Sequence, residues 1–455
     1  MVSTTVLWFR RDLRLADHPA LVEAAAGGHT VVALFVADPR LRDPSGAPRL
    51  AFLSRCLEAL DEAIGGHLVV RAGDPAEVVA ALAAETDAEA VHVTADFGPY
   101  GTERDEAVEL ALAAAGRRLV RVGSPYAADP GTVRKGDGQP FQVFTPFYRT
   151  WKAQGWPAPL PAPGEVAWAE GLRSDGVPEA PAIAASLPPA GEAAALERLE
   201  AFLAGPAPTY DTRRDQPAAD ATTRLSPYLK YGCIHPRQVL DRLDRSKPHE
   251  KLHSELAWRD FYADVLWHQP ATARRSLQPH MATMPVDAGR RADERFAAWA
   301  AGRTGYPLVD AGMRHLAAEA WMPNRVRMVA ASFLVKDLHL DWTRGARFFL
   351  QHLVDGDLAS NNHGWQWVAG TGTDPAPYFR IFNPTTQAKG HDPDGAYIRR
   401  WVPELAALSP PRIFEPWKAP AGPPGGYPTP IVDHAAERVD ALGRYAETRA
   451  SPRAG

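Results

Sequence analysis

Five short apolar segments, separated by amphipathic stretches, occupy the first 125 residues and narrow the folds open to this part of the chain. Each segment is rich in β-branched residues and is bounded by turn residues. The segments are residues 5–9, 30–36, 67–71, 90–94 and 118–122. Helical patterns lie between them, for example at 50–64 and 75–85. Strict alternation of strand and helix is typical of a parallel sheet covered by helices, so we predict an α/β domain with a parallel five-stranded, Rossmann-like sheet.

The rest of the chain has a different pattern. Ten prolines lie between residues 155 and 208, a density that neither a helix nor a strand ladder tolerates. From about residue 193 onward, most of the sequence has helical periodicity. The helical segments are 192–203, 236–243, 251–267, 292–301, 306–319, 324–338, 343–353 and 433–446. We therefore divide the chain into an α/β domain (1–130), a linker (131–205) and an all-α domain (206–455).

Composition excludes several classes of protein. No apolar run in the sequence approaches the roughly 18 residues that a transmembrane helix needs, and residues 1–14 lack the pattern of a signal peptide. The two cysteines, Cys56 and Cys233, are too few for a disulfide framework and form no CxxC motif. The His, Asp and Glu residues lack convincing metal-ligand spacing. We expect a cytoplasmic protein with no membrane segment and no metal site.

The net charge of −4 conceals an uneven distribution. Residues 1–125 hold 12 Lys and Arg against 18 Asp and Glu, whereas residues 209–360 hold 22 against 18. Most of the basic residues in the second segment are arginines, whose planar guanidinium groups bind phosphates well. An anionic partner such as a nucleic acid would account for this excess, and so would an ordinary solvated surface.

The side chains that carry chemistry gather in the second half of the chain. Glu255, Trp258, Arg259 and Tyr262 have the spacing of one helix face. A carboxylate, an indole, a guanidinium and a phenol together do not form a simple apolar stripe. An exposed amphipathic face with a half-buried tryptophan would give the same pattern, so this observation alone leaves both interpretations open.

Two more segments combine polar and aromatic residues. Asn324, Arg327 and Met328 lie on one helix face, after the sequence Trp-Met-Pro. In residues 355–367, Asp357 is placed to cap a helix that ends at Gly370. Burying so many amides and carboxylates is costly unless a polar ligand satisfies them. The first predicted strand, by contrast, is followed by WFRRDLR (8–14) and not by GxGxxG, which disfavours an ordinary dinucleotide site there.

Taken in order, these motifs resemble those of the photolyase/cryptochrome flavoproteins, and most closely those of bacterial class I cyclobutane pyrimidine dimer photolyases. The resemblance extends over nearly the whole chain. The blocks that carry it are LWFRRDLR (7–14), VFTPF (143–147), TTRLSP (222–227), ELAWR (255–259), GRTGYPLVD (302–310), WMPNRVRM (321–328), DGDLASNNHGWQW (355–367) and YFRIFNP (378–384).

The resemblance implies that the all-α domain binds FAD folded into a U-shape. Hydroxyls and arginine suit pyrophosphate, carboxylates suit ribose hydroxyls, and the neutral amide of Asn361 suits flavin N5. The residues implied for the phosphates and sugar are Tyr210, Thr222, Thr223, Arg224, Leu225 and Ser226. Those implied for the flavin, ribose and adenine are Arg259, Asn324, Arg327, Asp355, Asp357 and Asn361.

Repair members of the family split a pyrimidine dimer by electron transfer from photoexcited, reduced FAD, after the dimer is flipped out of the DNA. By resemblance, Glu255 would hydrogen-bond the dimer carbonyls and stabilise the radical anion. Trp258 and Trp367 would stack on the dimer, and Asn324 and Met328 would line its pocket. Arg325 would meet the DNA backbone. The expected partner is therefore UV-damaged DNA, and we expect a monomer.

Two other functions compete with dimer repair. A bacterial cryptochrome-type blue-light photoreceptor would share the motifs, but nothing after residue 384 suggests a long output tail. A light-independent adenine-nucleotide-binding protein would not account for the C-terminal blocks. Within the family, Met328 stands where (6-4)-photoproduct enzymes carry histidine. Asn361 is the amide of repair enzymes and bacterial members, where plant photoreceptors place aspartate.

The resemblance also concerns an antenna chromophore and an electron route. Residues 95–105 resemble the loop of deazaflavin-using members, which favours 8-hydroxy-5-deazaflavin over methenyltetrahydrofolate. Trp365 and Trp342 match the first two tryptophans through which such proteins reduce their flavin. The third, distal tryptophan is replaced by Gly289. We therefore expect light-driven flavin reduction to be weak, because glycine has no redox-active side chain.

Overall fold

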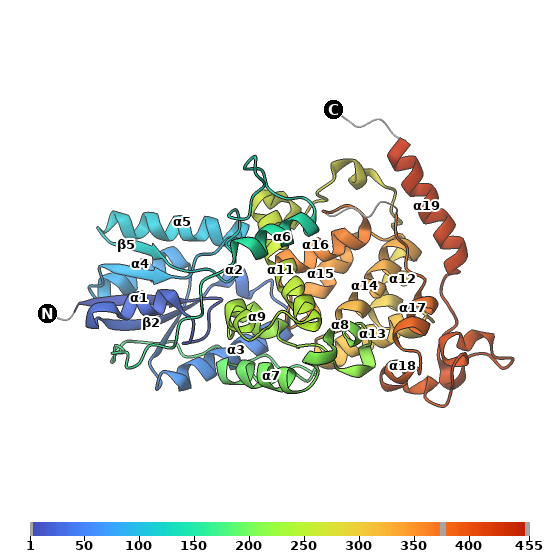
Figure 1. The fold of residues 1–455 in the computed structure, drawn as a ribbon, viewed down its shortest axis with the longest axis horizontal. Coiled ribbons are helices and arrows are strands. Elements are labelled where there is room, and N and C mark those ends of the chain that lie inside the picture. Colours follow the sequence, from blue (N-terminus) through green and yellow to red (C-terminus); the bar gives the residue numbers. More distant parts are fainter. Residues whose placement is uncertain (1–2, 374–378, 451–455) are drawn as a thin grey trace.

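The computed structural model describes residues 3–373 and 379–450. It is elongated, with the α/β domain at one end and the C-terminal helix α19 (His434–Ala450) at the other (Figure 1). The helical part lies between them. Within the described ranges, no helix combines the length and apolar character that crossing a membrane requires.

The predicted sheet is confirmed, and each strand begins and ends within a residue of its expected bounds. All the strand pairs are parallel, in the order β3-β2-β1-β4-β5. Strands β2 and β3 are therefore added on one side of β1, and β4 and β5 on its other side. The strands are β1 (Thr4–Phe9), β2 (Thr30–Ala37), β3 (Leu68–Ala72), β4 (Ala90–Val93) and β5 (Arg118–Arg121).

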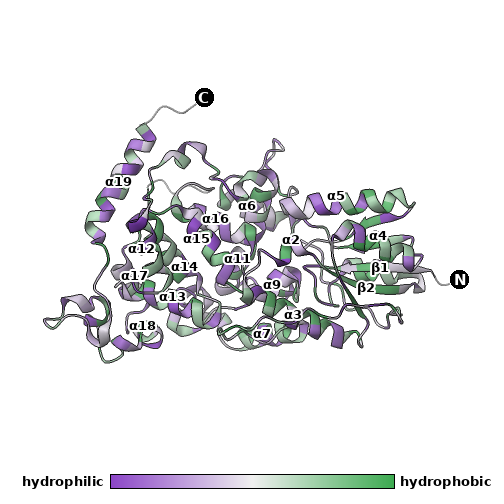
Figure 2. Cartoon of the chain, turned by 180° about the vertical axis from the view of Figure 1, so that it is seen from behind, coloured by the Kyte–Doolittle hydropathy of each residue, from purple (hydrophilic) through white to green (hydrophobic). Residues whose placement is uncertain are grey.

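Alternate residues of each strand face the two sides of the sheet. Leu7 and Phe9 pack in the core that α1 (Pro19–Ala25) and α3 (Ala47–Ala63) share, whereas Val6 and Trp8 pack on the side of α4 (Pro75–Glu85) and α5 (Pro99–Ala114). The strands are accordingly apolar on both faces, as the hydrophobic colours of β1 and β2 in Figure 2 show. A short helix, α2 (Pro39–Arg42), follows β2.

The segment that we predicted as a linker is more ordered than its prolines suggest. It contains helix α6 (Phe144–Gln154), whose Phe147 and Trp151 are fully buried. Irregular chain follows, and it is held against the sheet because the amide of Asp175 donates to the carbonyl of Val70 (2.7 Å). Helix α7 (Glu192–Ala204) then begins before the expected end of the linker. Proline thus prevents regular structure in this stretch but does not prevent packing.

The helical domain contains the helices predicted from periodicity. The long segment 324–338 differs from expectation, because the helix ends at Ser332 and continues as a wider turn in which the amide of Leu338 donates to the carbonyl of Phe333 (3.0 Å). The helices are α8 (Tyr210–Arg213), α9 (Ser226–Tyr231), α10 (Pro236–Asp241), α11 (Lys247–His268), α12 (Arg290–Ala300), α13 (Pro307–Glu319), α14 (Asn324–Ser332), α15 (Trp342–His352), α16 (Leu358–Ala369), α17 (Pro384–His391) and α18 (Ala396–Trp401).

The two domains share one continuous apolar core, in which Phe52 of α3 contacts Tyr228 and Tyr231 of α9 edge-on or tilted. Backbones also approach closely across the boundary. A Cβ atom at Gly46 would lie only 1.8 Å from the carbonyl oxygen of Gln351 in α15, and one at Gly232 only 2.0 Å from that of Arg11. Glycine is therefore required at both positions. The domains are fixed relative to each other, and residues from both can form one site.

Candidate functional site

The segment before α9 presents hydroxyl groups to a shared polar region. Ser226, the first residue of α9, donates to Oδ2 of Asp355 (2.6 Å) and accepts from Nε1 of Trp321 (3.3 Å). The Oγ1 of Thr222 is buried and has no hydrogen-bond partner among the described residues. A buried hydroxyl without a partner is costly, so this position fits the polar oxygen of a ligand.

Two residues of the same segment do not present free polar groups. Arg224 donates to Asp220 (2.7 Å) and Glu319 (3.1 Å), and its guanidinium lies 4.6 Å from the Trp321 ring centre. Leu225 is 1% exposed and belongs to the core. Both residues were expected to bind phosphate. Leu225 can do so only through its backbone, and Arg224 only through its backbone or the outer edge of its paired guanidinium.

Arg198 was not expected from the sequence, yet it positions the hydroxyl-bearing segment. It donates from Nε to the carbonyl of Thr223 (2.8 Å) and from Nη2 to that of Thr222 (2.9 Å). A guanidinium that binds two successive carbonyls fixes the direction of the backbone between them. Tyr210, at the start of α8, is buried and packs edge-on against Phe202 (5.6 Å between ring centres).

Asp355 and Arg327 form a two-pronged ion pair. Nη2 and Nη1 of Arg327 donate to the two carboxylate oxygens at 2.8 and 3.2 Å, and Nε donates to the carbonyl of Met322 (2.7 Å). Asp355 also accepts from Ser226, so both of its oxygens are used. The arrangement connects α14, the loop before α16 and α9 around a single carboxylate.

Asp357 caps α16, as the sequence predicted, and accepts from the amide of Ser360 (3.0 Å). Helix α16 also ends as predicted, at Gly370 in the left-handed conformation. Oδ2 of Asp357 accepts from Arg11 (2.8 Å), which belongs to the turn after β1. Burial opposes ionisation here, but Arg11 and Lys230 outweigh it and hold the pKa of Asp357 well below its usual range. The WFRRDLR turn therefore supplies a cation to the helical domain's site.

Arg259 and Asn361 are oriented by backbone carbonyls. Arg259 donates to the carbonyls of Pro125 (2.7 Å) and Leu229 (3.2 Å). Nδ2 of Asn361 donates to the carbonyl of Ala346 (3.0 Å) and to Oδ1 of Asn362 (2.9 Å). Both hydrogens of the Asn361 amide are thus engaged, and the contacts found among the described residues leave its Oδ1 available to accept.

The residues expected at the substrate lie on three helices that pack together, α11, α14 and α16. Glu255 of α11 is half-buried and accepts from Arg214 (2.5 Å). Trp258, one turn further, stacks on Phe144 with 3.7 Å between ring centres and an interplanar angle of 9°. One face of this indole is therefore covered by protein, which leaves at most the other for a ligand.

The remaining expected substrate contacts are partly exposed. Asn324, the first residue of α14, lies 3.9 Å from the sulfur of Met328 through its Nδ2. Trp367 is half-buried, with the guanidinium of Arg380 5.6 Å from its ring centre. Arg325, expected at the DNA backbone, is paired with Asp215 (2.8 Å). Of the matching block 378–384, Tyr378 lies outside the described residues.

The two tryptophans implied for electron transfer are nearly buried. Trp365 is 3% exposed and makes edge-to-face contacts with Phe349 and Trp299, at 5.0 and 6.2 Å between ring centres. A Cβ at Gly345 would lie 2.1 Å from the Trp365 ring, so the indole fills a notch in α15. Trp342, the first residue of α15, is 7% exposed and donates to Ser276 (3.2 Å).

A large cavity lies between the domains, at the carboxyl ends of β1, β2 and β4. Its volume is about 910 Å³. Trp8, Phe35 and Tyr100 line its sheet side, and Lys230, Asp357 and Trp342 line the opposite wall. Carboxyl ends of strands at a switch in strand order are the usual ligand site of such sheets. The loop 95–105, which the sequence indicated, borders this cavity through Phe97 and Tyr100.

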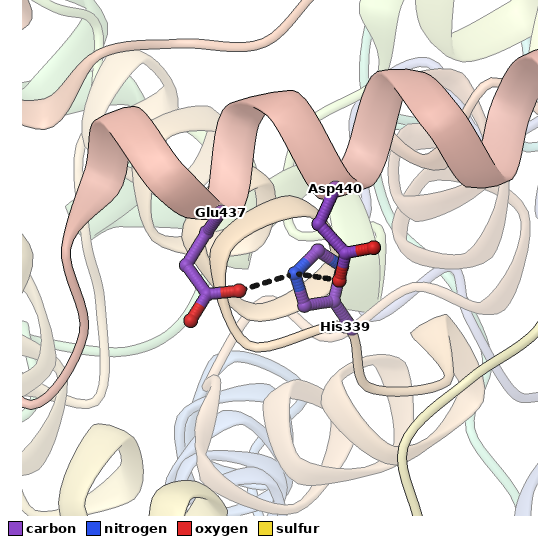
Figure 3. A group of neighbouring side chains, drawn as sticks. All are labelled: His339, Glu437 and Asp440. Atoms are coloured by element: carbon purple, nitrogen blue, oxygen red, sulfur yellow. Dashed lines mark hydrogen bonds and ion pairs between the residues drawn. The ribbon is translucent and has the colours of Figure 1, made fainter.

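One group of side chains has the composition of a metal site. Nε2 of His339 lies 2.7 Å from Glu437 and 3.4 Å from Asp440 of α19 (Figure 3). Arg295 and Arg444 pair with the same two carboxylates, at 3.4 and 2.9 Å. Two guanidinium groups so close to the carboxylates disfavour an added cation. We interpret the group as an ion-pair network that holds α19 against the domain.

Comparisons with known proteins identify the family of the chain. The family model described as DNA photolyase matches residues 5–164, and that described as the FAD binding domain of DNA photolyase matches residues 252–447. The deoxyribodipyrimidine photo-lyase of Streptomyces griseus is 42% identical, over 96% of this chain and 98% of the relative. That of Synechococcus sp. is 38% identical, over 99% of this chain and 98% of the relative.

Solved structures give the same result. A bacterial class III photolyase from Agrobacterium tumefaciens superposes with a TM-score of 0.92 at 34% identity, covering 99% of this chain and 98% of that one. An archaeal photolyase from Sulfolobus tokodaii, solved with two FAD molecules, has a TM-score of 0.86 at 30% identity, covering 98% and 100%. Relatives of this similarity along the full length leave no doubt about ancestry: the chain belongs to the DNA photolyase family.

Proposed function

We propose that this protein is a light-dependent DNA-repair enzyme, a deoxyribodipyrimidine photo-lyase, which splits cyclobutane pyrimidine dimers with FAD as its cofactor. The observation that carries the proposal is the packing of α11, which bears Glu255 and Trp258, against α16, which bears Trp367. Helix α14 also packs on α16 and bears Asn324, Met328 and the Arg327 of the Arg327–Asp355 pair. Full-length relatives at 36 to 42% identity, named for this reaction, support it. Whether the chain is of class I, as its motifs suggest, stays a prediction.

The residues present fit FAD. The orphaned hydroxyl of Thr222 suits a phosphate or sugar oxygen, and the free Oδ1 of Asn361 suits the N5–H of a reduced flavin. Ser226 donates to Asp355, so its hydroxyl oxygen would only accept, as from a sugar hydroxyl. Asp355, Asp357, Arg259 and Arg327 would hold the ribityl, ribose and adenine groups, with Tyr210, Thr223, Arg224, Leu225 and Asn324 around them. Bound, reduced FAD would supply the electron that splits the dimer after blue light is absorbed.

The protein's own residues would hold a flipped-out dimer in place. The face of Trp258 opposite Phe144 and the half-buried ring of Trp367 would offer apolar surfaces on which a pyrimidine stacks. Glu255, as a carboxylate, accepts hydrogen bonds only, so it would meet a pyrimidine N–H. Arg214 beside it carries the donors that suit the dimer carbonyls and the charge that develops on them. Asn324 and Met328 would close the remaining side.

We propose 8-hydroxy-5-deazaflavin as the antenna chromophore, bound in the cavity between the domains. The volume of about 910 Å³ and the aromatic walls of Trp8, Phe35 and Tyr100 support a large planar ligand there. Methenyltetrahydrofolate and a second FAD are the alternatives. Mass spectrometry of the chromophores released from purified protein distinguishes the three.

We also propose that the chain acts as a monomer on UV-damaged DNA, with domains at residues 1–130 and 206–455 and a connecting segment between them. The test of the whole proposal is the loss of dimers from an irradiated oligonucleotide under blue light. A cryptochrome-type photoreceptor without repair activity would bind FAD and respond to light, yet leave the dimers intact. Copurified FAD together with light-dependent loss of dimers supports repair.

A further inference from the structure

A second cavity, of about 570 Å³, lies on the side of Trp342 away from the sheet domain. We call it the Trp342 cavity. Trp342 borders both this cavity and the larger one between the domains. Among the described residues, no other aromatic ring stacks on Trp342. The indole is therefore separate from the buried rings that surround Trp365, and it faces a hollow that a small molecule could enter. The other residues of the Trp342 cavity on which the argument depends are Arg274, Arg275, His339, Thr371 and Arg444.

The charge of the Trp342 cavity favours an anion. Arg274 and Arg275 are exposed, and neither has an ion-pair partner in the part of the chain that the structure describes. The lining carboxylate, Asp341, is engaged in capping α15, since it accepts from the amide (2.7 Å) and hydroxyl (2.6 Å) of Thr343. The two unpaired guanidinium groups of Arg274 and Arg275 therefore outnumber the single carboxylate of Asp341, which leaves a positive excess at the hollow.

A buried polar atom points to the same conclusion independently. Thr371 is 3% exposed and lines the Trp342 cavity, and its Oγ1 has no hydrogen-bond partner among the described residues. His339 cannot supply a further free charge, because it is paired with carboxylates of α19 (Figure 3). Arg444 is likewise paired, with Asp287 and with Asp440 of α19. A hydroxyl and two guanidinium groups form a suitable donor set for a carboxylate or sulfonate.

Gly289 stands where the distal tryptophan is expected, and its backbone conformation disfavours any side chain. Gly289 has φ 81° and ψ −171°, a conformation open essentially to glycine alone. It caps α12 and does not line the Trp342 cavity. An electron that replaces one withdrawn from Trp342 must therefore come from elsewhere.

We propose that the Trp342 cavity binds a small organic anion carrying a thiol, and that this thiol reduces oxidised Trp342 directly. The proposal deepens the proposed function, on which it rests through the electron route. Each thiol would give one electron to an oxidised Trp342 indole and release its proton to solvent, and the two thiyl radicals formed in successive rounds would join as a disulfide. Bound oxidised FAD, once excited by light, would be the acceptor of the two electrons and would take up two protons from solvent. The cavity thus takes the place of the distal tryptophan.

Binding is tested in the dark, independently of any activity. The probe is 2-mercaptoethanesulfonate, titrated calorimetrically into the purified holoprotein. We expect saturable binding that weakens about tenfold or more in Arg275→Gln and in the Arg274→Gln/Arg275→Gln double variant, because each loses a charged donor. Arg291→Gln is the matched control, since Arg291 is an exposed arginine outside the cavity. Absent binding, or equal binding in the double variant, overturns the proposal.

The redox step is tested by blue-light reduction of oxidised flavin. With 2-mercaptoethanesulfonate, we expect a rate that saturates and exceeds that with neutral 2-mercaptoethanol, and the double variant should lose this preference. Trp342→Phe should abolish photoreduction with both thiols while dark binding persists; a wild-type rate in that variant overturns the redox step. If chemically reduced wild-type protein fails to repair dimers, the proposed function is contradicted. The binding measured in the dark would still show whether the Trp342 cavity takes up the thiol anion.

Discussion

Arg214, at the end of α8, donates to the carboxylate of Glu255 on α11 at 2.5 Å. The ion pair is partly exposed, with side chains 19% and 26% accessible, so its direct contribution to stability is small. Its value is positional. It holds an acceptor and a cation side by side at the proposed dimer site, where Glu255 alone was expected to act on the carbonyls.

Replacing Glu255 by Ala should lower the quantum yield of repair several-fold and leave affinity for dimer-containing DNA nearly unchanged. The change removes an acceptor for the dimer and the partner that orients Arg214, but no phosphate contact. Yield is measured as dimers split per photon absorbed by chemically reduced enzyme. An unchanged yield would remove Glu255 from the mechanism.

Arg327→Lys should purify with much less flavin than wild type. Lysine keeps the charge but cannot make the two-pronged contact with Asp355 together with the bond to the Met322 carbonyl. We expect FAD affinity to fall roughly ten- to a hundredfold. The ratio of flavin to protein absorbance reports it, and full occupancy in the variant would contradict the assigned role of this pair.

Asp260 should make stability fall as pH rises through the weakly acid range. Burial raises its pKa to about 6, opposed by Arg259 and by donors that include Trp151 and the Ala128 amide. A raised folded-state pKa means that its stabilising effect is complete below about pH 4 and is lost as pH rises through about 6.

Asp260→Asn lacks this titration but keeps an oxygen acceptor. Between pH 4 and pH 7, the unfolding free energy of wild type should decrease relative to that of the variant by at most about 3 kcal/mol. Denaturant unfolding at the two pH values measures the difference. A difference between the two proteins that is the same at both pH values would refute the assignment.

Gly46→Ala should loosen the contact between the domains. The new Cβ would lie 1.8 Å from the Gln351 carbonyl oxygen, so one backbone has to move, at a cost of about 1–3 kcal/mol. Gly136→Ala is the control, because a Cβ there would meet no atom within 4 Å. Thermal unfolding should show a lower Tm for the first variant alone; equal Tm values would mean that the close approach is unimportant.

The sequence was informative where a local pattern determines structure. β-Branched runs bounded by turns located all five strands, and Asp357 with Gly370 defined both ends of α16. Helix α6 was missed because it has Pro146 in its first turn and ends at Gly155, where the proline-rich stretch begins. The wider turn after Ser332 was missed because its residues do not differ in kind from those of an ordinary helix. Contacts between distant segments, such as Arg11 with Asp357 and Arg214 with Glu255, depend on tertiary packing that no local pattern encodes.

The substitution Gly289→Trp illustrates why the backbone matters for design. The sequence alone suggests it as a repair of the broken electron route. A side chain at φ 81° and ψ −171° costs on the order of 1–3 kcal/mol, although its Cβ atom would meet no atom within 4 Å. Weak photoreduction in that variant would therefore reflect strain as readily as chemistry, which makes variants of Trp342, Arg274 and Arg275 the better probes.

The central claim is that this protein repairs pyrimidine dimers with light, and the most direct measurement follows the dimers themselves. Chemically reduced enzyme is mixed with an oligonucleotide carrying one defined cyclobutane dimer, and the intact dimer is quantified before and after blue light, with a dark sample alongside. We predict near-complete conversion to the undamaged oligonucleotide in light and none in the dark. Conversion in light no greater than that in enzyme-free buffer, with FAD bound and reduced, would contradict the account.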